Sequence, residues 1–238
     1  NSKIKLFYIF MKKIISFSIY GDDYKYTIGL IKNIDIINSK YPDWGIYIYY
    51  SNIPIFILNI LKTKGNCFIF PCIHKGFKWE GMFWRFYPIE SNIDIMLSRD
   101  ADSRITEREM DLVNQWIKSN KTFHIIRDNM GHRIEILGGT WGCKVRQFQE
   151  KYKIKKIDEY LKNYYKRFAK DMKRQPDQYF LKENIYPHII NDNMSHISFE
   201  FLRYSKEDIM IDKCEDNFIG KDIDFTKEEI KEFISDYS

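Results

Sequence analysis

The stretch Ile93-Asp94-Ile95-Met96-Leu97-Ser98-Arg99-Asp100-Ala101-Asp102-Ser103-Arg104 holds an apolar run that ends in two aspartates. Asp100 and Asp102 are one residue apart and have arginines on both sides. The short run predicts a buried strand whose C-terminal end lies where ligands bind in open α/β sheets. Two carboxylates there can converge on one hard cation, because Mg²⁺ and Mn²⁺ prefer oxygen ligands. The alternative is a polar turn that caps the next helix.

The sequence before this stretch predicts strands that alternate with helices. Strands are expected at Lys12–Tyr20, Gly45–Tyr50 and Asn66–Phe70, and helices at Lys25–Asn38 and Ile55–Lys62. This β-α-β-α-β order predicts an α/β fold with a mostly parallel central sheet and flanking helices. The first strand is not followed by G-x-G-x-x-G, and G-x-x-x-x-G-K-[ST] does not occur, so Rossmann dinucleotide and P-loop sites have no support.

The sequence around and after the aspartate pair predicts a helix on each side of it and one more strand. Gly81–Tyr87 is expected to be helical, and Thr106 and Glu109 form a capping box for the helix that follows the aspartates. Lys121–Arg127 predicts a strand. The next segment contains Leu137-Gly138-Gly139-Thr140-Trp141-Gly142, where such closely spaced glycines indicate either a close approach to the backbone or a tight turn.

The remaining sequence predicts two further helices. Lys155–Lys173 has apolar residues at helical spacing, and Thr226 and Glu229 form a capping box for a final helix. No internal repeat or flexible linker is visible. We therefore expect a single domain over residues 1–238, with a core at about 12–200 and a C-terminal tail at 201–238 that carries the final helix.

The composition limits the class of protein. The 238 residues are 44% hydrophobic, which is enough for a sizeable core. The net charge of +5 permits an anionic ligand, but no basic stripe or reading motif indicates nucleic acid. The four cysteines form no C-x-x-C pair and are expected to be reduced thiols. No apolar run reaches the ~20 residues of a membrane span, so we expect a soluble protein of the cytoplasm.

Three functions could use the aspartate pair. A transferase for a nucleotide-diphosphate sugar would use a metal ion to bridge the carboxylates and the diphosphate, with Arg85, Arg99 and Arg104 near the leaving group. A phosphatase of the haloacid dehalogenase type also places D-x-D after an apolar strand, but near its N-terminus and with Thr or Val where Arg104 stands. A non-catalytic glycan- or nucleotide-binding module would use the aspartates as a turn. The mid-chain position of D-x-D favours the transferase.

The order of these segments resembles the GT-A glycosyltransferases, in particular the retaining family-eight type, and also a divergent group of uncharacterised bacterial and viral glycosyltransferases. The resemblance covers about Lys12 to His196 and includes the D-x-D and the later Asp177-Gln178 pair. It implies a GT-A fold and a Mn²⁺- or Mg²⁺-dependent hexosyltransferase with a nucleotide-sugar donor, expected to be a UDP-sugar. The acceptor would be a glycan, a protein or another hydroxyl compound.

The resemblance also implies a site, residue by residue. The segment that ends the first strand would hold the uridine, Arg85 and Lys221 would contact the donor phosphates, and Asp128 and Gln178 would orient the sugar. The implied metal ligands are Asp100, Asp102 and His196. The implied donor site is Tyr20, Gly21, Asp22, Tyr24, Arg85, Asp100, Gly138 and Gly139, and the implied catalytic residues are Asp177, Gln178 and Asp128.

Two features of this site stay open in the sequence. The family's H-x-x-G-x-x-K-P-W ending is missing, and Phe218-Ile219-Gly220-Lys221 matches it only in part, so the third metal ligand could also be His124, His132 or His188. The resemblance implies retention, in which the departing diphosphate oxygen can accept the acceptor's proton. An inverting enzyme would need a carboxylate below the anomeric carbon, and Asp177 could serve as that base or as a nucleophile.

Overall fold

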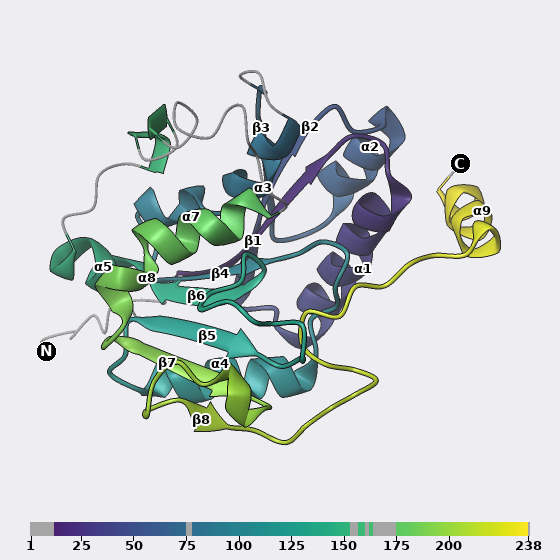
Figure 1. Ribbon diagram of the computed structural model, residues 1–238. Coiled ribbons are helices and arrows are strands. Elements are labelled where there is room, and N and C mark those ends of the chain that lie inside the picture. The colour runs from purple at the N-terminus through teal and green to yellow at the C-terminus, as the bar shows by residue number, and fades with distance from the viewer. Residues whose placement is uncertain (1–11, 75–77, 153–156, 160–161, 164–174, 238) are drawn as a thin grey trace, which may run out of the picture.

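The computed structural model describes residues 12–74, 78–152, 157–159, 162–163 and 175–237. Its centre is an eight-stranded sheet in the order β3-β2-β1-β4-β6-β5-β7-β8 (Figure 1). The strands are β1 (Lys13–Tyr20), β2 (Trp44–Ser51), β3 (Cys67–Pro71), β4 (Ile95–Arg99), β5 (Phe123–Arg127), β6 (Thr140–Lys144), β7 (Asn193–Ile197) and β8 (Ile209–Met210). The helices are α1 (Tyr24–Lys40), α2 (Ile55–Thr63), α3 (Gly81–Trp84), α4 (Glu107–Lys118), α5 (Val145–Lys151), α7 (Pro176–Asn184), α8 (Tyr186–Ile189) and α9 (Lys227–Asp236).

The strand order confirms the predicted α/β fold. β1 pairs in parallel with both β2 and β4, and β2 pairs in parallel with β3. β6 is antiparallel and lies between β4 and β5, and β5 pairs in parallel with β7. As a consequence, β1, β4, β5 and β7 all end at one edge of the sheet. The glycine-rich segment enters β6 from that same edge.

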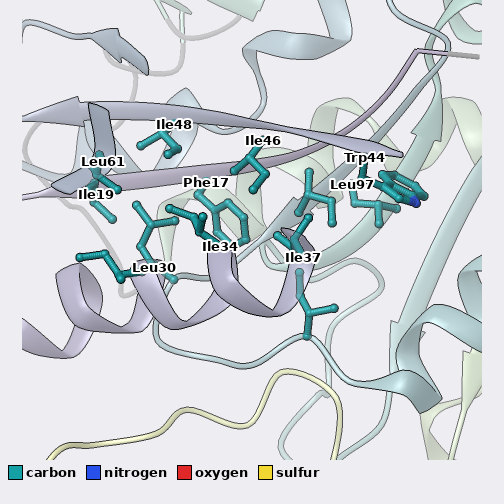
Figure 2. Packing of buried hydrophobic residues seen from close by; sticks show 14 of the residues in the cluster. Phe17, Ile19, Leu30, Ile34, Ile37, Trp44, Ile46, Ile48, Leu61 and Leu97 are labelled. Carbon is teal, nitrogen blue, oxygen red and sulfur yellow. The ribbon is translucent and has the colours of Figure 1, made fainter. Parts of the chain in front are cut away.

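Hydrophobic side chains cover both faces of the sheet. On one face, which we call the α1/α4 face, Phe17 and Leu97 pack with α1, α2 and α4, and Figure 2 shows Leu30 and Ile34 of α1 in this layer. On the opposite α3/α7 face, Met96 packs with residues of α3, α5, α7 and α8. Because successive side chains of a strand point to opposite faces, each strand residue is committed to one layer.

One of the two predicted capping boxes is complete. At the start of α9, the Thr226 hydroxyl accepts a hydrogen bond from the Glu229 N–H, and the Glu229 carboxylate accepts one from the Thr226 N–H. At the start of α4, Thr106 accepts from the Glu109 N–H at 3.1 Å, but the Glu109 side chain contacts Arg99 instead. The expected second half of that box is therefore replaced by a buried ion pair.

Two other predicted helices are found over only part of their expected ranges. The helix expected at Gly81–Tyr87 is confirmed at Gly81–Trp84 and is followed by a 3₁₀ helix at Tyr87–Glu90. Most of the helix expected at Lys155–Lys173 lies outside the described residues. In the part of the chain that the structure describes, no helix is both long enough and apolar enough to cross a membrane.

Candidate functional site

Three of the predicted site residues meet at the edge where β1, β4 and β5 end. Arg85 follows α3, and its Nη1 forms an ion pair with Asp100 Oδ1, directly after β4. Its Nη2 lies 2.7 Å from Oδ2 of Asp177, in the first turn of α7. The Arg85 backbone N–H donates to Ser18 Oγ of β1 at 2.8 Å. One guanidinium thus joins the ends of elements that are far apart in the sequence.

Burial strengthens the electrostatic attraction between Arg85 and the two aspartates. Arg85 is 6% exposed and Asp177 is 1% exposed, whereas the Asp100 side chain is 40% exposed. Burial acts against the charge of Arg85, but Asp100 and Asp177 outweigh it and raise the Arg85 pKa. Burial raises the pKa of Asp177, and Arg85 acts in the opposite direction. Oδ1 of Asp177 is buried and has no hydrogen-bond partner among the described residues.

Positions 138 and 139 require glycine, because a carboxylate lies directly against the backbone at each of them. A Cβ added at Gly138 would overlap Asp177 Oδ2 and Arg85 Nη2, and one added at Gly139 would overlap Asp100 Oδ2. Ser98 of β4 fixes this segment by donating from Oγ to the Gly138 carbonyl oxygen at 2.7 Å. Of the two sequence interpretations, the structure therefore supports a close approach to the backbone.

Asp102 lies beside a segment that sequence reasoning had placed in the tail. The Ile223 N–H donates to the Asp102 carbonyl oxygen at 2.8 Å, and Ser103 and Asp222 form an antiparallel bridge. Burial and the neighbouring Asp100 raise the pKa of Asp102 to about 6. Lys25 of α1, which lies 2.8 Å from Asp222 Oδ2, acts in the opposite direction and lowers the Asp102 pKa. The only sequence signal for this contact was the partial match at residues 218–221.

A cleft of about 430 Å³ opens between these parts. Asp100 and Gly139 line it from the sheet edge, and Gln178 lines it from α7. The opposite wall includes His132 and residues of the 218–223 segment. The structure thus brings Asp100, Gly139 and Gln178, three of the residues named by the resemblance, to one cleft.

Asp128 lies below this cleft rather than in its lining. It is 1% exposed, its Oδ1 is 3.0 Å from Arg108 Nη2, and its Oδ2 accepts from the Ile219 N–H at 2.8 Å. Its backbone N–H donates to Nδ1 of His132 at 3.0 Å. Asp128 is therefore placed to hold the 218–223 segment and His132, and it is not among the residues that line the cleft.

The structure does not bring His196 to the aspartates. His196 lies on β7 and is fully buried, and its Nδ1 is 2.8 Å from Nε2 of His124. The His124 ring stacks on Trp116 of α4, so both histidines belong to the α1/α4 face. Arg85 and Asp177 lie on the other face. His196 therefore belongs to a core pair, and this placement removes the reason to include it among the metal ligands.

The remaining candidate metal ligand and the remaining candidate phosphate-binding residues are spread over the molecule. His188 is exposed on α8. Arg99 is buried on the α1/α4 face with Glu109, Arg104 lies over the Phe225 ring at 5.3 Å, and the Lys221 ammonium is 2.5 Å from the Asp216 carbonyl oxygen. Among the arginines expected near a leaving group, only Arg85 contacts Asp100 or Asp177 within the described residues.

The predicted base-binding segment lies at the same edge, at the end of β1. Tyr20 is half-buried and packs edge-on against Trp84, with ring centroids 6.0 Å apart. Burial raises its pKa, while the nearby Arg85 lowers it. Gly21 turns the chain with φ +79°, and its N–H donates to the Ser51 carbonyl oxygen at 3.1 Å. Asp22 is exposed and Tyr24 begins α1, and both follow the end of β1 directly in the chain.

The donor set at the end of β4 fits a hard divalent cation. After burial, which is the larger cause, the charge of Asp100 raises the Asp102 pKa, and a cation bound between the two carboxylates would relieve this repulsion. No group of three or more His, Cys, Asp or Glu side chains with metal-site geometry is present among the described residues. Mg²⁺ commonly takes only one or two protein carboxylates and completes its shell with water and substrate phosphates, so two aspartates suffice.

Comparison with known proteins supports the fold. No family model and no curated protein matches the chain. The solved structure of the glycosyltransferase GlyE from Streptococcus pneumoniae TIGR4 is similar with a TM-score of 0.52 and 15% identity, over 78% of this chain and 45% of that chain. The galactosyltransferase LgtC in complex with donor and acceptor sugar analogs gives 0.50 and 14%, over 77% and 73%. This chain has a GT-A fold.

The GT-A fold accounts for the placement of the cleft at the carboxyl ends of the parallel strands. The similarity to GlyE and LgtC confirms the fold that the resemblance implied, while the narrower assignment to family eight stays a prediction. The chain spans less than half the length of GlyE.

Proposed function

We propose that the chain is a metal-dependent glycosyltransferase that moves a hexose-type sugar from a UDP-sugar to a hydroxyl group of a glycan, a protein or another acceptor, with retention. The Arg85 bridge carries this proposal. One buried guanidinium joins Asp100, on the side expected to bind the diphosphate, to Asp177, on the side expected to bind the sugar. The similar structures GlyE and LgtC are both glycosyltransferases, which supports this class of reaction.

Asp100 and Asp102 would hold Mn²⁺ or Mg²⁺. When bound, such a cation neutralises the negative charge that develops on the diphosphate leaving group. Arg85 would also stabilise the negative charge on the diphosphate, since its positive charge is buried and its position is fixed by two carboxylates. Tyr20, Gly21, Asp22 and Tyr24 would bind the uridine at the end of β1.

Asp177 and Gln178 would orient the donor sugar. Oδ1 of Asp177 is buried and accepts no hydrogen bond from the part of the chain that the structure describes, so a sugar hydroxyl is a suitable donor for it. Gln178 lines the cleft one residue further along α7. Gly138 and Gly139 would flank the sugar with bare backbone, and Asp128 would act indirectly by holding the wall of the cleft.

Retention requires no strong general base. The departing diphosphate oxygen can accept the acceptor's proton on the same face of the sugar, so catalysis comes mainly from positioning and electrostatics. Asp177 stays the candidate base or nucleophile if the reaction inverts or proceeds in two steps. The anomeric configuration of the product, determined by NMR, decides between inversion and retention.

The test is calorimetry of UDP binding with and without Mn²⁺. The Asp102 side chain makes no hydrogen bond with another described side chain, so Asp102→Ala should fold normally while losing the metal-dependent part of the affinity. Asp111→Ala, at an exposed carboxylate of α4, is the matched control and should bind as the native protein does. UDP binding that is equal in all three proteins and indifferent to Mn²⁺ would remove the basis of the proposal.

A second measurement separates the phosphatase alternative. Turnover of p-nitrophenyl phosphate that is lost in Asp100→Asn would favour the phosphatase. Mn²⁺-dependent hydrolysis of a UDP-sugar, measured over a panel of donors, would favour the glycosyltransferase and identify the sugar.

A further inference from the structure

The loop after β5 fixes the proton of one histidine in the cleft. The backbone N–H of Asp128 lies 3.0 Å from Nδ1 of His132. A backbone N–H can only donate, so Nδ1 must accept and carries no proton. A neutral imidazole with an accepting Nδ1 has its proton on Nε2, and an imidazolium could not accept this hydrogen bond at all. The structure therefore specifies both the charge and the tautomer of His132.

The orientation of the His132 ring is fixed from two sides. Its own loop is a tight turn, in which the His132 N–H donates to the Asn129 carbonyl oxygen at 2.9 Å. On the other side, the Phe218 ring meets it edge-on with centroids 5.7 Å apart. Gly220, at φ +87°, lies so near that an added Cβ would be 3.6 Å from His132 Cε1. The ring is held between the β5 loop and the C-terminal segment.

The Nε2–H of His132 is left for a ligand. It has no hydrogen-bond acceptor among the described residues, and the residue lines the same cleft as Asp100 and Gln178. A nitrogen that carries a proton has no lone pair for a metal ion, so this tautomer also argues against His132 as the third metal ligand. The side chain is set to donate one hydrogen bond into the cleft.

We propose that His132 donates this hydrogen bond to an oxygen of the leaving diphosphate, an inference that rests on the proposed transferase function. The His132 ring packs against Phe218, and the same segment is hydrogen-bonded to Asp102 through Ile223, so the ring is on the Asp102 side of the cleft. Asp177 and Gln178 stand on the α7 side, where the sugar is assigned. A fixed N–H aimed at an oxygen whose negative charge grows during the reaction stabilises the transition state more than the bound donor.

Substitution at position 132 tests the donor role. His132→Phe keeps a planar ring without the N–H, His132→Gln restores an N–H near the Nε2 position, and His188→Phe makes the same change at an exposed histidine. In Mn²⁺-dependent hydrolysis of the UDP-sugar, His132→Phe should lower kcat about 100-fold, which is the usual effect of losing one such donor. KM should change much less, His132→Gln should recover at least tenfold of the loss, and His188→Phe should match the native enzyme.

The tautomer can be observed directly in the native protein. With ¹⁵N-labelled histidine, NMR should show His132 protonated at Nε2 alone, and addition of UDP with diamagnetic Mg²⁺ should move that proton downfield. An Nδ1-protonated ring, a normal kcat in His132→Phe, or a glutamine variant as slow as the phenylalanine variant would each overturn the proposal while leaving the transferase function intact. Failure of the native protein to bind UDP, GDP, CDP and dTDP with Mn²⁺ would overturn both.

Discussion

Replacing Gly139 with alanine tests whether the position of Asp100 is set by the backbone beneath it. The added Cβ would overlap Oδ2 of Asp100, and the carboxylate has to withdraw by about 1.6 Å before the two atoms reach the 3.4 Å of an ordinary van der Waals contact. That movement breaks the ion pair with Arg85 and takes Asp100 away from the expected metal position. Because a misplacement of about 1 Å in a catalytic group can cost about 100-fold, we expect a loss of that order in UDP-sugar turnover.

The effect of Gly139→Ala on stability should be small. The atom that must move is the end of a flexible side chain that is 40% exposed, so we expect destabilisation near the lower end of the 1–3 kcal/mol that overpacking costs. Gly138→Ala differs, because its Cβ meets Asp177 and Arg85, which are both buried. Breaking that buried pair should cost about 3–5 kcal/mol.

The assays are urea unfolding for stability and calorimetry with Mn²⁺ and UDP for the site. Gly65→Ala is the control, since a Cβ there meets nothing within 4 Å. We expect Gly138→Ala to lose stability, Gly139→Ala to lose metal-dependent UDP binding, and Gly65→Ala to lose neither. A Gly139→Ala protein that binds UDP and Mn²⁺ within twofold of the native affinity would show that Asp100 does not need its observed position.

Two further predictions concern the α1/α4 face. Glu109→Gln should destabilise the fold by about 3–5 kcal/mol in urea unfolding, because it leaves the fully buried Arg99 without its counterion; a loss below about 1 kcal/mol would contradict a charged pair. The pKa of His196 is lowered to about 4 by burial, and that of His124 is lowered by burial, by His196 and by Arg99. The unfolded chain therefore binds protons that the folded chain does not as pH falls from about 6.5 towards 4, so stability should drop over that window, by about 3 kcal/mol at pH 4 from His196 alone. Urea unfolding at pH 7, 5.5 and 4.5 checks this, and His124→Phe should fall less steeply than the native protein.

The elements that sequence predicted well are those governed by local pattern. The alternation of strands and helices, the buried strand before Asp100 and the capping box at Thr226 all depend on neighbouring residues, and the structure confirms each of them. The glycine pair was also informative, because close glycines indicated that something approaches the backbone. What approaches is the carboxylate pair itself, which local pattern could not reveal.

The sequence could not assign residues whose role depends on a distant partner. His196 lies in the core because its side chain points to the α1/α4 face of β7. A change of one residue in the register of β7 would have pointed it to the opposite face. Asp128 looked like a sugar contact, but Ile219, 91 residues away, takes one of its oxygens. In the sequence, His132 is one of three alternative candidates for the third metal ligand. Its distinct role follows only from the hydrogen bond that its Nδ1 accepts from the Asp128 N–H.

The contact between the start of α1 and the C-terminal segment has a consequence for the order of assembly. Lys25 and Asp222 are 197 residues apart and form an ion pair, and Phe233 of α9 packs into the hydrophobic layer of α1. During synthesis the sheet edge with Asp100 can form well before residue 223 has left the ribosome, but the second wall of the cleft cannot. A nascent chain would therefore hold its aspartates in an open groove until residues 218–223 emerge and complete the cleft.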